Sequence, residues 1–482
     1  MPSWMDGGQN EKEERQRIKF AVKKNFKRQK KAQARQLRGH KQTTRRQAKS
    51  TAEGLQHSGT VSVNSGSATR STPQSLQSRI LSGQSFTEPL QYDEASLLMH
   101  YLDHVFPYQY PCYDKAKWSR GWLLWLLSRN GPLYRASLGL AAFHQRSLTG
   151  EANNDRLELE FHTKAVRQLH DFLTSMNITA LEPENETLVE IITCGVALIS
   201  FEVLRGSTAD WQSHLCAMAS IAVTMHHQPQ LPKSPDQLVG SRGIAAIEFH
   251  IPVLLWMDLL ACVATQEKPK LPYDQWLGPN CTFQLGDIMG CHNPVMKAIG
   301  DLAVLSQWKL NFVTGDLGHS EFNLRARQIE DSLENVMDTT PMKPSGSEQQ
   351  PNQNSVTRIF ATATLAQLAS LSSNAPDAIA SSRVRRAVSR VVLEIQMAGQ
   401  TVTPRQLSWP LCVAGCLADQ DQQGFFEAFL NPVVSEGSGM IGNCGTIRNI
   451  LKACWANKIE RPNERWDCSS TMKQMGIHAL LI

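Results

Sequence analysis

The chain has 482 residues, of which 41% are hydrophobic and 19% charged, and its formal net charge is +5. This length is beyond one ordinary domain and predicts either several domains or one large helical assembly with tails. No apolar run reaches the roughly 18 residues of a membrane span and no signal peptide is recognisable, so we expect an intracellular protein without a membrane partner.

The positive charge is concentrated in residues 11–49. This segment contains sixteen Lys and Arg against three Glu, a local net charge of +13, whereas the remainder of the chain has a net charge of −8. We define residues 1–49 as the basic arm. The part between residues 23 and 35 lacks Pro and Gly, so it can become a helix once phosphates neutralise its charge, and we expect it to stay disordered when unbound.

Three interpretations of the basic arm are open: a solvated tail without a specific partner, a nuclear-import signal, and direct contact with the DNA backbone. Import and DNA contact are compatible with each other. Lys and Arg contacts to phosphates position a protein without specifying bases, and no leucine heptad follows that could dimerise a basic-leucine-zipper helix. The predicted DNA-contacting side chains are Lys23, Lys24, Lys27, Arg28, Lys30, Lys31, Arg35 and Arg38.

Residues 50–86 predict a disordered linker between the basic arm and the body. Of these 37 residues, 23 are Ser, Thr, Gly, Gln or Asn, which cannot bury enough apolar surface to offset the entropy of ordering. The body then begins near residue 87 and runs to residue 482. Its first helices are predicted at residues 88–106 (ended by Pro107 and Pro111), 118–128, 133–146, 154–176, 187–204 and 211–226.

The central stretch of the body, residues 251–309, predicts two helices joined by an irregular turn. The first is apolar around nearly its whole circumference, which is typical of a buried helix, and only Asp258 interrupts it. The second opens with Asn293 as a predicted N-cap and Pro294 at the first helical position. In the second helix, apolar residues recur at three- and four-residue spacing, and Lys297 pairs with Asp301 on the opposite face.

The last part of the chain continues the helical pattern. Residues 321–337 predict a charged surface helix, and residues 341–355 predict a disordered low-complexity loop. Further helices are predicted at residues 356–372, 383–398, 408–418, 424–430 and 446–458. No sustained period-two alternation indicates a strand, so we expect an all-α fold, a large irregular multi-helix regulatory domain preceded by the disordered basic arm.

Several stretches in the same order along the body resemble one known family. They are YLDHVFPYQYPCY (residues 101–113), RGWLLWLLSRNGPLYRASLGLAAFHQ (120–145), LLWMDLLACVAT (254–265), MGCHNPVMKAIGDLAVLSQWK (289–309), RQLSWPLCVAGCLA (405–418) and the end of the chain from residue 466. Together they resemble the fungal-specific transcription factor domain, the helical regulatory region of many fungal zinc-cluster regulators, including relatives of the acriflavine sensitivity control protein.

This resemblance implies a nuclear transcriptional regulator of RNA polymerase II genes, with a secondary-metabolite cluster as the expected target. The helical body would then be a regulatory module for transcription co-regulators and for an apolar small molecule whose identity is open, and a homo- or heterodimer is also open. The alternative is a co-regulator that acts through a DNA-bound partner without touching DNA. A helical enzyme is a third alternative that no residue pattern favours.

The sequence departs from the family at its DNA-binding module. A zinc cluster needs six cysteines arranged around C-x2-C pairs, because thiolates must bridge two zinc ions. This chain contains no C-x2-C and no cysteine before Cys112, so the cluster is absent from it, whether lost, never present or missing from a truncated gene model. We therefore expect no metal and no cofactor.

The remaining candidates for chemistry have simpler explanations. In a reducing compartment the eleven cysteines should be mostly buried thiols, and Cys412 and Cys416, one helical turn apart in an apolar helix, favour packing over metal binding or redox sensing. Residues 437–442 fit the letters GxGxxG but lack the preceding strand that a dinucleotide site needs. Asp258 should hydrogen-bond a nearby group, with a ligand contact as the alternative. No catalytic motif is present, and we expect no enzyme.

Overall fold

The computed structural model describes residues 91–113, 120–149, 155–175, 186–208, 210–226, 240–278, 281, 283–312, 316–341, 350–373, 378–435 and 442–482. The basic arm, the linker and the eight predicted DNA-contacting residues lie outside these ranges, as do residues 437–441 of the GxGxxG match. Every regular element within the described ranges is a helix, so the prediction of an all-α body is confirmed.

The first half of the body runs from α2 to α9. Its elements are α2 (Tyr92–His100), the π-helical turn η1 (Tyr101–Val105), α3 (Phe106–Gln109), α4 (Gly121–Leu127), α5 (Pro132–Thr149), α6 (Asp155–Ser175), α7 (Glu186–Leu204), α8 (Trp211–His226) and α9 (Gly240–Thr265). The second half contains α10 (Tyr273–Trp276), α11 (Gly286–Met289), α12 (Asn293–Phe312), α13 (Asp316–Thr339), α14 (Gln350–Ser372), α15 (Ala378–Ala398), the 3-10 turns η4 (Gly399–Thr401) and η5 (Pro404–Leu407), α16 (Ser408–Leu417), α17 (Gln420–Ser435), α18 (Cys444–Glu460) and α19 (Cys468–Met475).

Three predicted helix boundaries differ from the structure. Each lies near a proline, a residue that the local rule treats as a helix breaker. Pro107 does not end the first helix, because α3 follows the π-helical turn η1 without a break and continues to Gln109. Pro252 lies inside α9, which begins at Gly240 rather than near residue 251. Pro252 has no N–H to donate to the carbonyl of Glu248. Glu248 is exposed, so water can hydrate this carbonyl. Helix α14 begins at Gln350, within the predicted 341–355 loop, of which residues 342–349 lie outside the described ranges.

The predicted N-cap role of Asn293 was wrong. Its side-chain Oδ1 accepts a hydrogen bond from the backbone N–H of Leu285 at 2.9 Å, and its Nδ2 donates to the carbonyl of Phe283 at 2.9 Å. The side chain therefore fastens the turn before α12 instead of capping the helix. Helix α12 begins at Asn293, so Pro294 is its second residue and not its first. The predicted burial of Val295, Ile299 and Leu302 and the pair of Lys297 with Asp301, at 3.0 Å, are confirmed.

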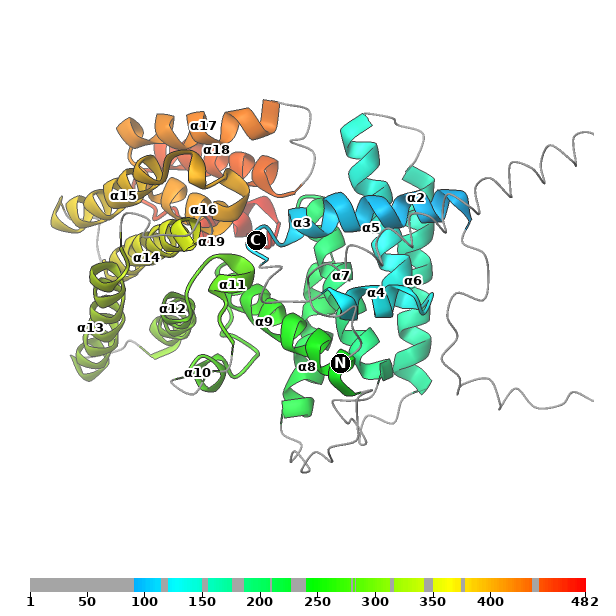
Figure 1. Ribbon diagram of the computed structural model, residues 1–482. Coiled ribbons are helices and arrows are strands. Elements are labelled where there is room, and N and C mark those ends of the chain that lie inside the picture. Colours follow the sequence, from blue (N-terminus) through cyan, green and yellow to red (C-terminus); the bar gives the residue numbers. More distant parts are fainter. Residues whose placement is uncertain are drawn as a thin grey trace, which may run out of the picture.

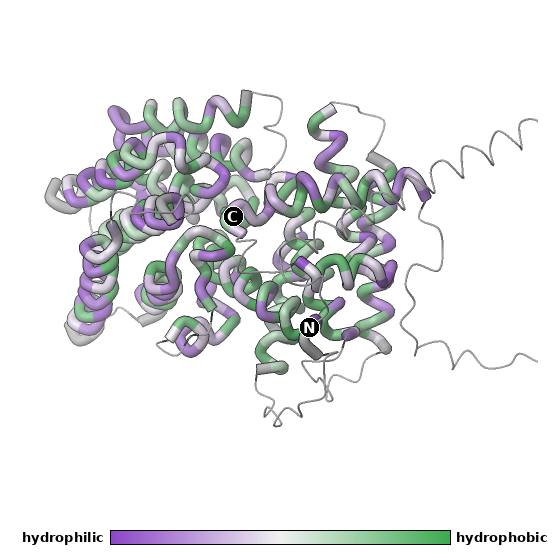
Figure 2. Tube along the Cα trace, viewed as in Figure 1, coloured by the Kyte–Doolittle hydropathy of each residue, from purple (hydrophilic) through white to green (hydrophobic). Residues whose placement is uncertain are grey.

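The two halves meet along α9 (Figure 1). Helices α2 to α8 lie on one side of it and α12 to α18 on the other, and the C-terminus lies between them. On one side α9 packs against α4, α7 and α8, and on the other against α12 and α19. The hydropathy colouring shows hydrophobic residues along α9 and many hydrophilic ones along α13 at the outer edge (Figure 2).

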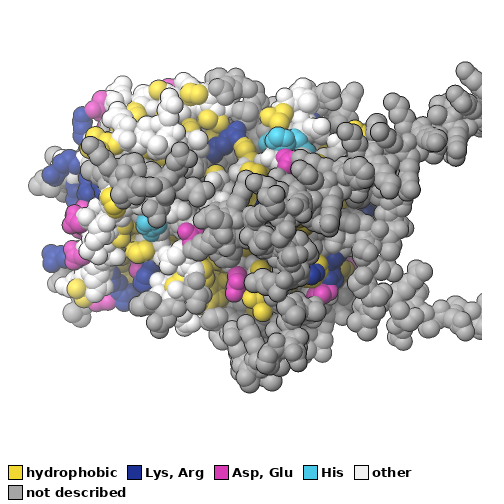
Figure 3. All heavy atoms as spheres, viewed as in Figure 1, with side chains coloured by type: hydrophobic (Ala, Val, Ile, Leu, Met, Phe, Trp, Pro, Cys, Tyr) yellow, Lys and Arg dark blue, Asp and Glu magenta, His cyan; other side chains and the backbone are white. Residues whose placement is uncertain are grey.

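The outer edge of the second half is a charged surface. Lys, Arg, Asp and Glu side chains intermingle there, where α13 and α15 lie (Figure 3). Among them are the pairs Arg383–Glu330 at 2.7 Å and Arg390–Glu334 at 2.6 Å, both more than a third exposed. The prediction of a charged surface helix at residues 321–337 is thereby confirmed.

Two helices are long and apolar enough to cross a membrane by length and composition alone, contrary to the expectation from the sequence. They are α7 and the Arg242–Thr265 part of α9. Of their most apolar windows, 94% and 78% respectively are buried inside the body, which is the environment of core helices in a large helical protein.

Candidate functional site

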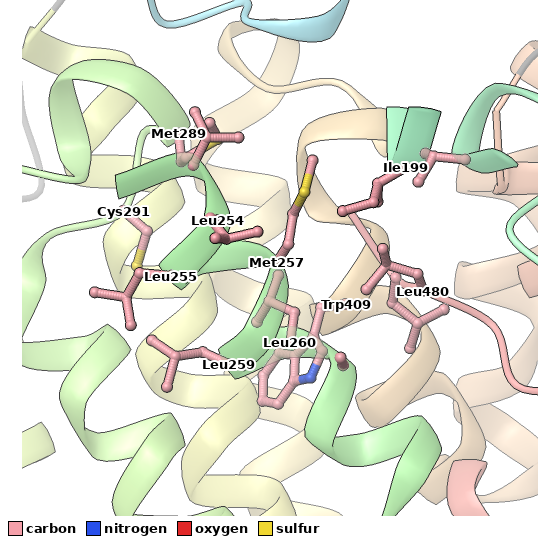
Figure 4. Packing of buried hydrophobic residues seen from close by; sticks show 14 of the residues in the cluster. Ile199, Leu254, Leu255, Met257, Leu259, Leu260, Met289, Cys291, Trp409 and Leu480 are labelled. Carbon is pink, nitrogen blue, oxygen red and sulfur yellow. The ribbon is translucent and has the colours of Figure 1, made fainter. Parts of the chain in front are cut away.

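Helix α9 lies between the two halves and contributes to the buried core of both. Leu254, Leu255, Met257, Leu259 and Leu260 are almost fully buried. Their neighbours come from distant parts of the chain: Ile199 from α7, Met289 and Cys291 from around α11, Trp409 from α16 and Leu480 from the C-terminal segment (Figure 4). Helix α9 thus organises both halves, as its all-round apolar pattern predicts.

Asp258 fastens the turn that follows α9. Its side chain is 2% exposed, and Oδ2 accepts hydrogen bonds from the backbone N–H groups of Lys270 at 2.7 Å and Leu271 at 2.8 Å. Burial raises the pKa of this carboxyl to about 6, against the effect of the two N–H donors. The hydrogen-bonding interpretation of Asp258 is confirmed.

Cys412 and Cys416 belong to a cluster of four buried thiols. Cys412 contacts Cys468 of α19 within hydrogen-bonding range, and Cys416 contacts Cys454 of α18. Burial raises the pKa of the Cys416 thiol well above its ordinary value. This thiol is therefore neutral and packs in the core instead of reacting as a thiolate. All eleven cysteines carry free thiols, and the described residues contain no group of three or more His, Cys, Asp or Glu able to hold a metal ion.

A second cluster, which the sequence analysis missed, joins histidines of the first half. His100 Nε2 lies 2.9 Å from His144 Nδ1, and the His100 and His104 rings are 4.8 Å apart between centroids. Burial, together with the neighbouring His100, His104 and Arg405, lowers the pKa of His144 to about 4. His144 is therefore neutral at pH 7.

The cluster borders a cavity of about 580 Å³ between the two halves, which we call the junction cavity. Its apolar lining includes Tyr110, Val203, Leu204, Trp256, Met257 and Met289. Its polar lining includes His144, Ser200, Thr403, Arg405, Gln406 and Asn443. The Arg405 guanidinium lies over the ring of Tyr108, 4.3 Å from its centroid.

Most of these residues lie in the stretches that carry the family resemblance, but no local pattern in the sequence indicates a site. Tyr108, Met257 and Arg405 each lie in a different one of the stretches that carry the family resemblance. No spacing rule joins them, because they are far apart in the chain and only the packing of α3, α9 and η5 brings them together. The predicted DNA-contacting residues of the basic arm cannot be placed relative to this cavity, since they lie outside the described ranges.

The comparison with known families decides the identity of the body. The profile described as fungal specific transcription factor domain matches residues 96–482, nearly the whole body. The chain belongs to this family. No solved structure matches the chain.

Several relatives of this chain are regulators of biosynthetic gene clusters. The trichothecene biosynthesis transcription regulator TRI10 of Trichoderma arundinaceum is 24% identical over 78% of this chain and 95% of its own length. TRI10 of Fusarium sporotrichioides is 26% identical over 82% of this chain and 99% of its own length. The pestheic acid cluster transcriptional regulator 3 of Pestalotiopsis fici is 24% identical over 100% of this chain and 92% of its own length. The family and these relatives are transcription regulators and not enzymes, in agreement with the lack of catalytic motifs.

Proposed function

We propose that this protein is a nuclear transcriptional regulator that controls RNA polymerase II genes of a secondary-metabolite cluster. The observation that carries the proposal is the near-complete coverage of the two trichothecene regulators, 95% and 99% of their lengths, by a single alignment with this chain. The matched family domain spans residues 96–482, most of this chain. The body is therefore the regulatory module, with co-regulators as its protein partners.

The DNA-contacting element is the basic arm. The net charge of +13 in residues 11–49, against −8 elsewhere, favours the arm for contact with phosphates. Each neutralised phosphate releases a condensed counterion, so affinity depends on charge and falls as salt rises. Through this mechanism the arm supplies affinity for the DNA backbone, and its dense Lys and Arg clusters supply the import signal. Base-specific reading requires a further element or a partner.

A DNA-binding experiment tests the arm. The full-length protein and a variant with its eight predicted contact residues changed to Gln are titrated with duplex DNA at 50 to 200 mM salt. If all eight residues contact phosphates, the plot of log affinity against log salt for the unmodified protein has a slope of roughly −7, and the Gln variant loses most of this slope. A variant with the arm sequence shuffled at constant composition is the control, and it should keep both affinity and slope.

A second candidate is a co-regulator that reaches DNA through a partner, because Lys and Arg contacts to phosphates do not by themselves specify bases. Chromatin occupancy separates the two functions. The tagged full-length protein is compared with a deletion of residues 11–49 that carries an added import signal. Peaks that vanish in the deletion support the arm, whereas unchanged peaks show that a partner reads the DNA. The absence of peaks for both proteins contradicts the regulator assignment itself.

A further inference from the structure

We propose that the junction cavity is a binding site for an apolar small molecule that carries one acidic group. The inference goes beyond the proposed function, because it assigns a ligand class and a location in the body. It rests on three observations: the size of the cavity, the division of its lining into an apolar part and a polar part that contains Arg405, and its position between the two halves.

The size and apolar lining fit a small organic molecule. A volume of about 580 Å³ lies within the range of small-molecule sites, which are mostly apolar with a few placed polar groups. Trp256 and Met257 of α9, Leu204 of α7 and Met289 beside α11 supply broad and polarisable surfaces. Other cavities fit less well: one of about 90 Å³ is too small, and one of about 1000 Å³ runs along the ion-paired surface of Asp274, Lys297 and Asp301.

The polar part of the lining contains one cationic side chain, Arg405, among neutral groups. Arg405 presents a planar guanidinium whose donors match a carboxylate or sulfonate in a two-pronged arrangement, and its stacking on Tyr108 holds this plane in place. Its field contributes to the lowered pKa of His144, which consequently stays neutral beside it. The main-chain oxygen of Ile482, which also lines the cavity, already accepts from Asn443 Nδ2 at 2.9 Å. An acidic ligand is therefore directed toward Arg405 and away from Ile482.

The position of the cavity links ligand binding to the arrangement of the halves. Leu204 and Met257 belong to the first half, and Arg405 belongs to η5, which leads directly into the buried helix α16 of the second half. A molecule that contacts both walls binds the native arrangement and not the unfolded chain, so it stabilises the body by mass action. This gives the regulatory body a means of responding to a metabolite.

Two fluorescent probes that differ only in their acidic group test the site. The full-length protein is titrated with 1-anilinonaphthalene-8-sulfonate and with N-phenyl-1-naphthylamine, the same aromatic framework without the sulfonate. We expect saturable binding of the sulfonate with one site per chain and a raised Tm. Arg405→Gln should weaken sulfonate binding by about tenfold or more, since a charge-assisted contact is lost, and should leave binding of the neutral probe within about twofold. Arg461→Gln is the matched control, because that guanidinium also stacks on an aromatic ring, Trp466, at 4.6 Å.

Filling the cavity gives an independent readout. Val203→Trp from α7 and Val433→Trp from α17 occupy it from opposite walls, and each should abolish binding of both probes while the circular dichroism spectrum and Tm are retained. Two variants keep the test decisive if one of them fails to fold. Unchanged binding in a folded Trp variant, or no saturable binding to the unmodified protein, overturns the proposal. Equal binding of the two probes with no effect of Arg405→Gln overturns the acidic ligand class. None of these measurements involves DNA, so failure here is distinguishable from failure of the proposed function.

Discussion

At the scale of single residues, Glu190 on α7 is the most exceptional buried charge of the first half. Its side chain is 1% exposed, Oε2 accepts from Arg129 Nε at 3.3 Å, and Oε1 has no hydrogen-bond partner among the described residues. Gly131 makes room for it, since a Cβ there would lie 1.7 Å from Oε1. Burial, opposed by Arg129, raises the pKa of Glu190 to about 7.

The raised pKa of Glu190 predicts a pH-dependent stability. Because the folded-state pKa lies above the unfolded value, the contribution of Glu190 is fully present below pH 4.5 and is lost as pH rises through about 7. Glu190→Gln removes this pH dependence. Between pH 5 and pH 8 the unmodified protein should therefore lose about 3 kcal/mol of unfolding free energy relative to the variant. Urea unfolding at both pH values measures it. Glu186→Gln, which alters a half-exposed partner of the same Arg129, is the control, and an equal shift in that control contradicts the prediction.

At the scale of elements, one guanidinium holds α13, α14 and α15 together. Arg358 of α14 donates to both carboxylate oxygens of Glu394 on α15, at 2.9 and 2.7 Å, and to the carbonyls of Met337 and Thr340 at the end of α13, at 2.7 and 3.0 Å. Arg358 and Glu394 are 6% and 8% exposed. Such a buried pair fixes how the helices pack against one another. It adds less to net stability, because moving both charges out of water costs free energy.

Breaking this pair should be far more harmful than replacing it. Arg358→Met leaves Glu394 buried without its partner and should reduce the unfolding free energy by about 3–5 kcal/mol. The double variant Arg358→Met with Glu394→Leu should recover most of that loss, since no unpaired charge remains. Denaturant unfolding of both variants measures the difference. The control is Arg383→Gln, which breaks the exposed pair with Glu330 and should cost about 1 kcal/mol or less. A double variant as unstable as the single one contradicts the argument.

At the scale of the whole molecule, the C-terminal segment joins the two halves. The N–H of Leu480 donates to the carbonyl of Ser207 in the first half, and its carbonyl accepts from Asn443 Nδ2 in the second half. Trp211 Nε1 donates to the carbonyl of His478 at 2.8 Å. Leu480 and Leu481 are fully buried, so the segment is part of the core between the halves rather than a tail.

Truncating this segment's side chains should therefore loosen the whole body. Leu480→Ala and Leu481→Ala should each reduce the unfolding free energy by about 2–5 kcal/mol, through lost burial and residual cavities. Together they should separate the unfolding of the two halves into distinct transitions, which differential scanning calorimetry detects. Ile459→Ala, at a position 76% exposed, is the matched aliphatic control and should leave a single transition at nearly the original Tm. A double variant that behaves like Ile459→Ala contradicts the joining role.

Local patterns in the sequence determined the helical class, most of the helices, the burial of α9 and the division between a basic arm and an acidic body. Helix α8 and the C-terminal end of α7 match their predicted boundaries, because periodicity and capping signals are local. Local rules failed at Pro107 and Pro252, which helices accommodate, and at Asn293, whose side chain forms tertiary hydrogen bonds instead of capping α12.

Only the tertiary structure decided which distant residues meet. Cys412 came together with Cys468, Arg405 with Tyr108, and Leu480 with Ser207, and no spacing within the chain marks any of these pairs. The physical reason is that a helix buried on all sides has no preferred partner in its own sequence. Its partners follow from the shape complementarity of neighbouring helices, which packs the core densely and leaves the junction cavity where the two halves meet.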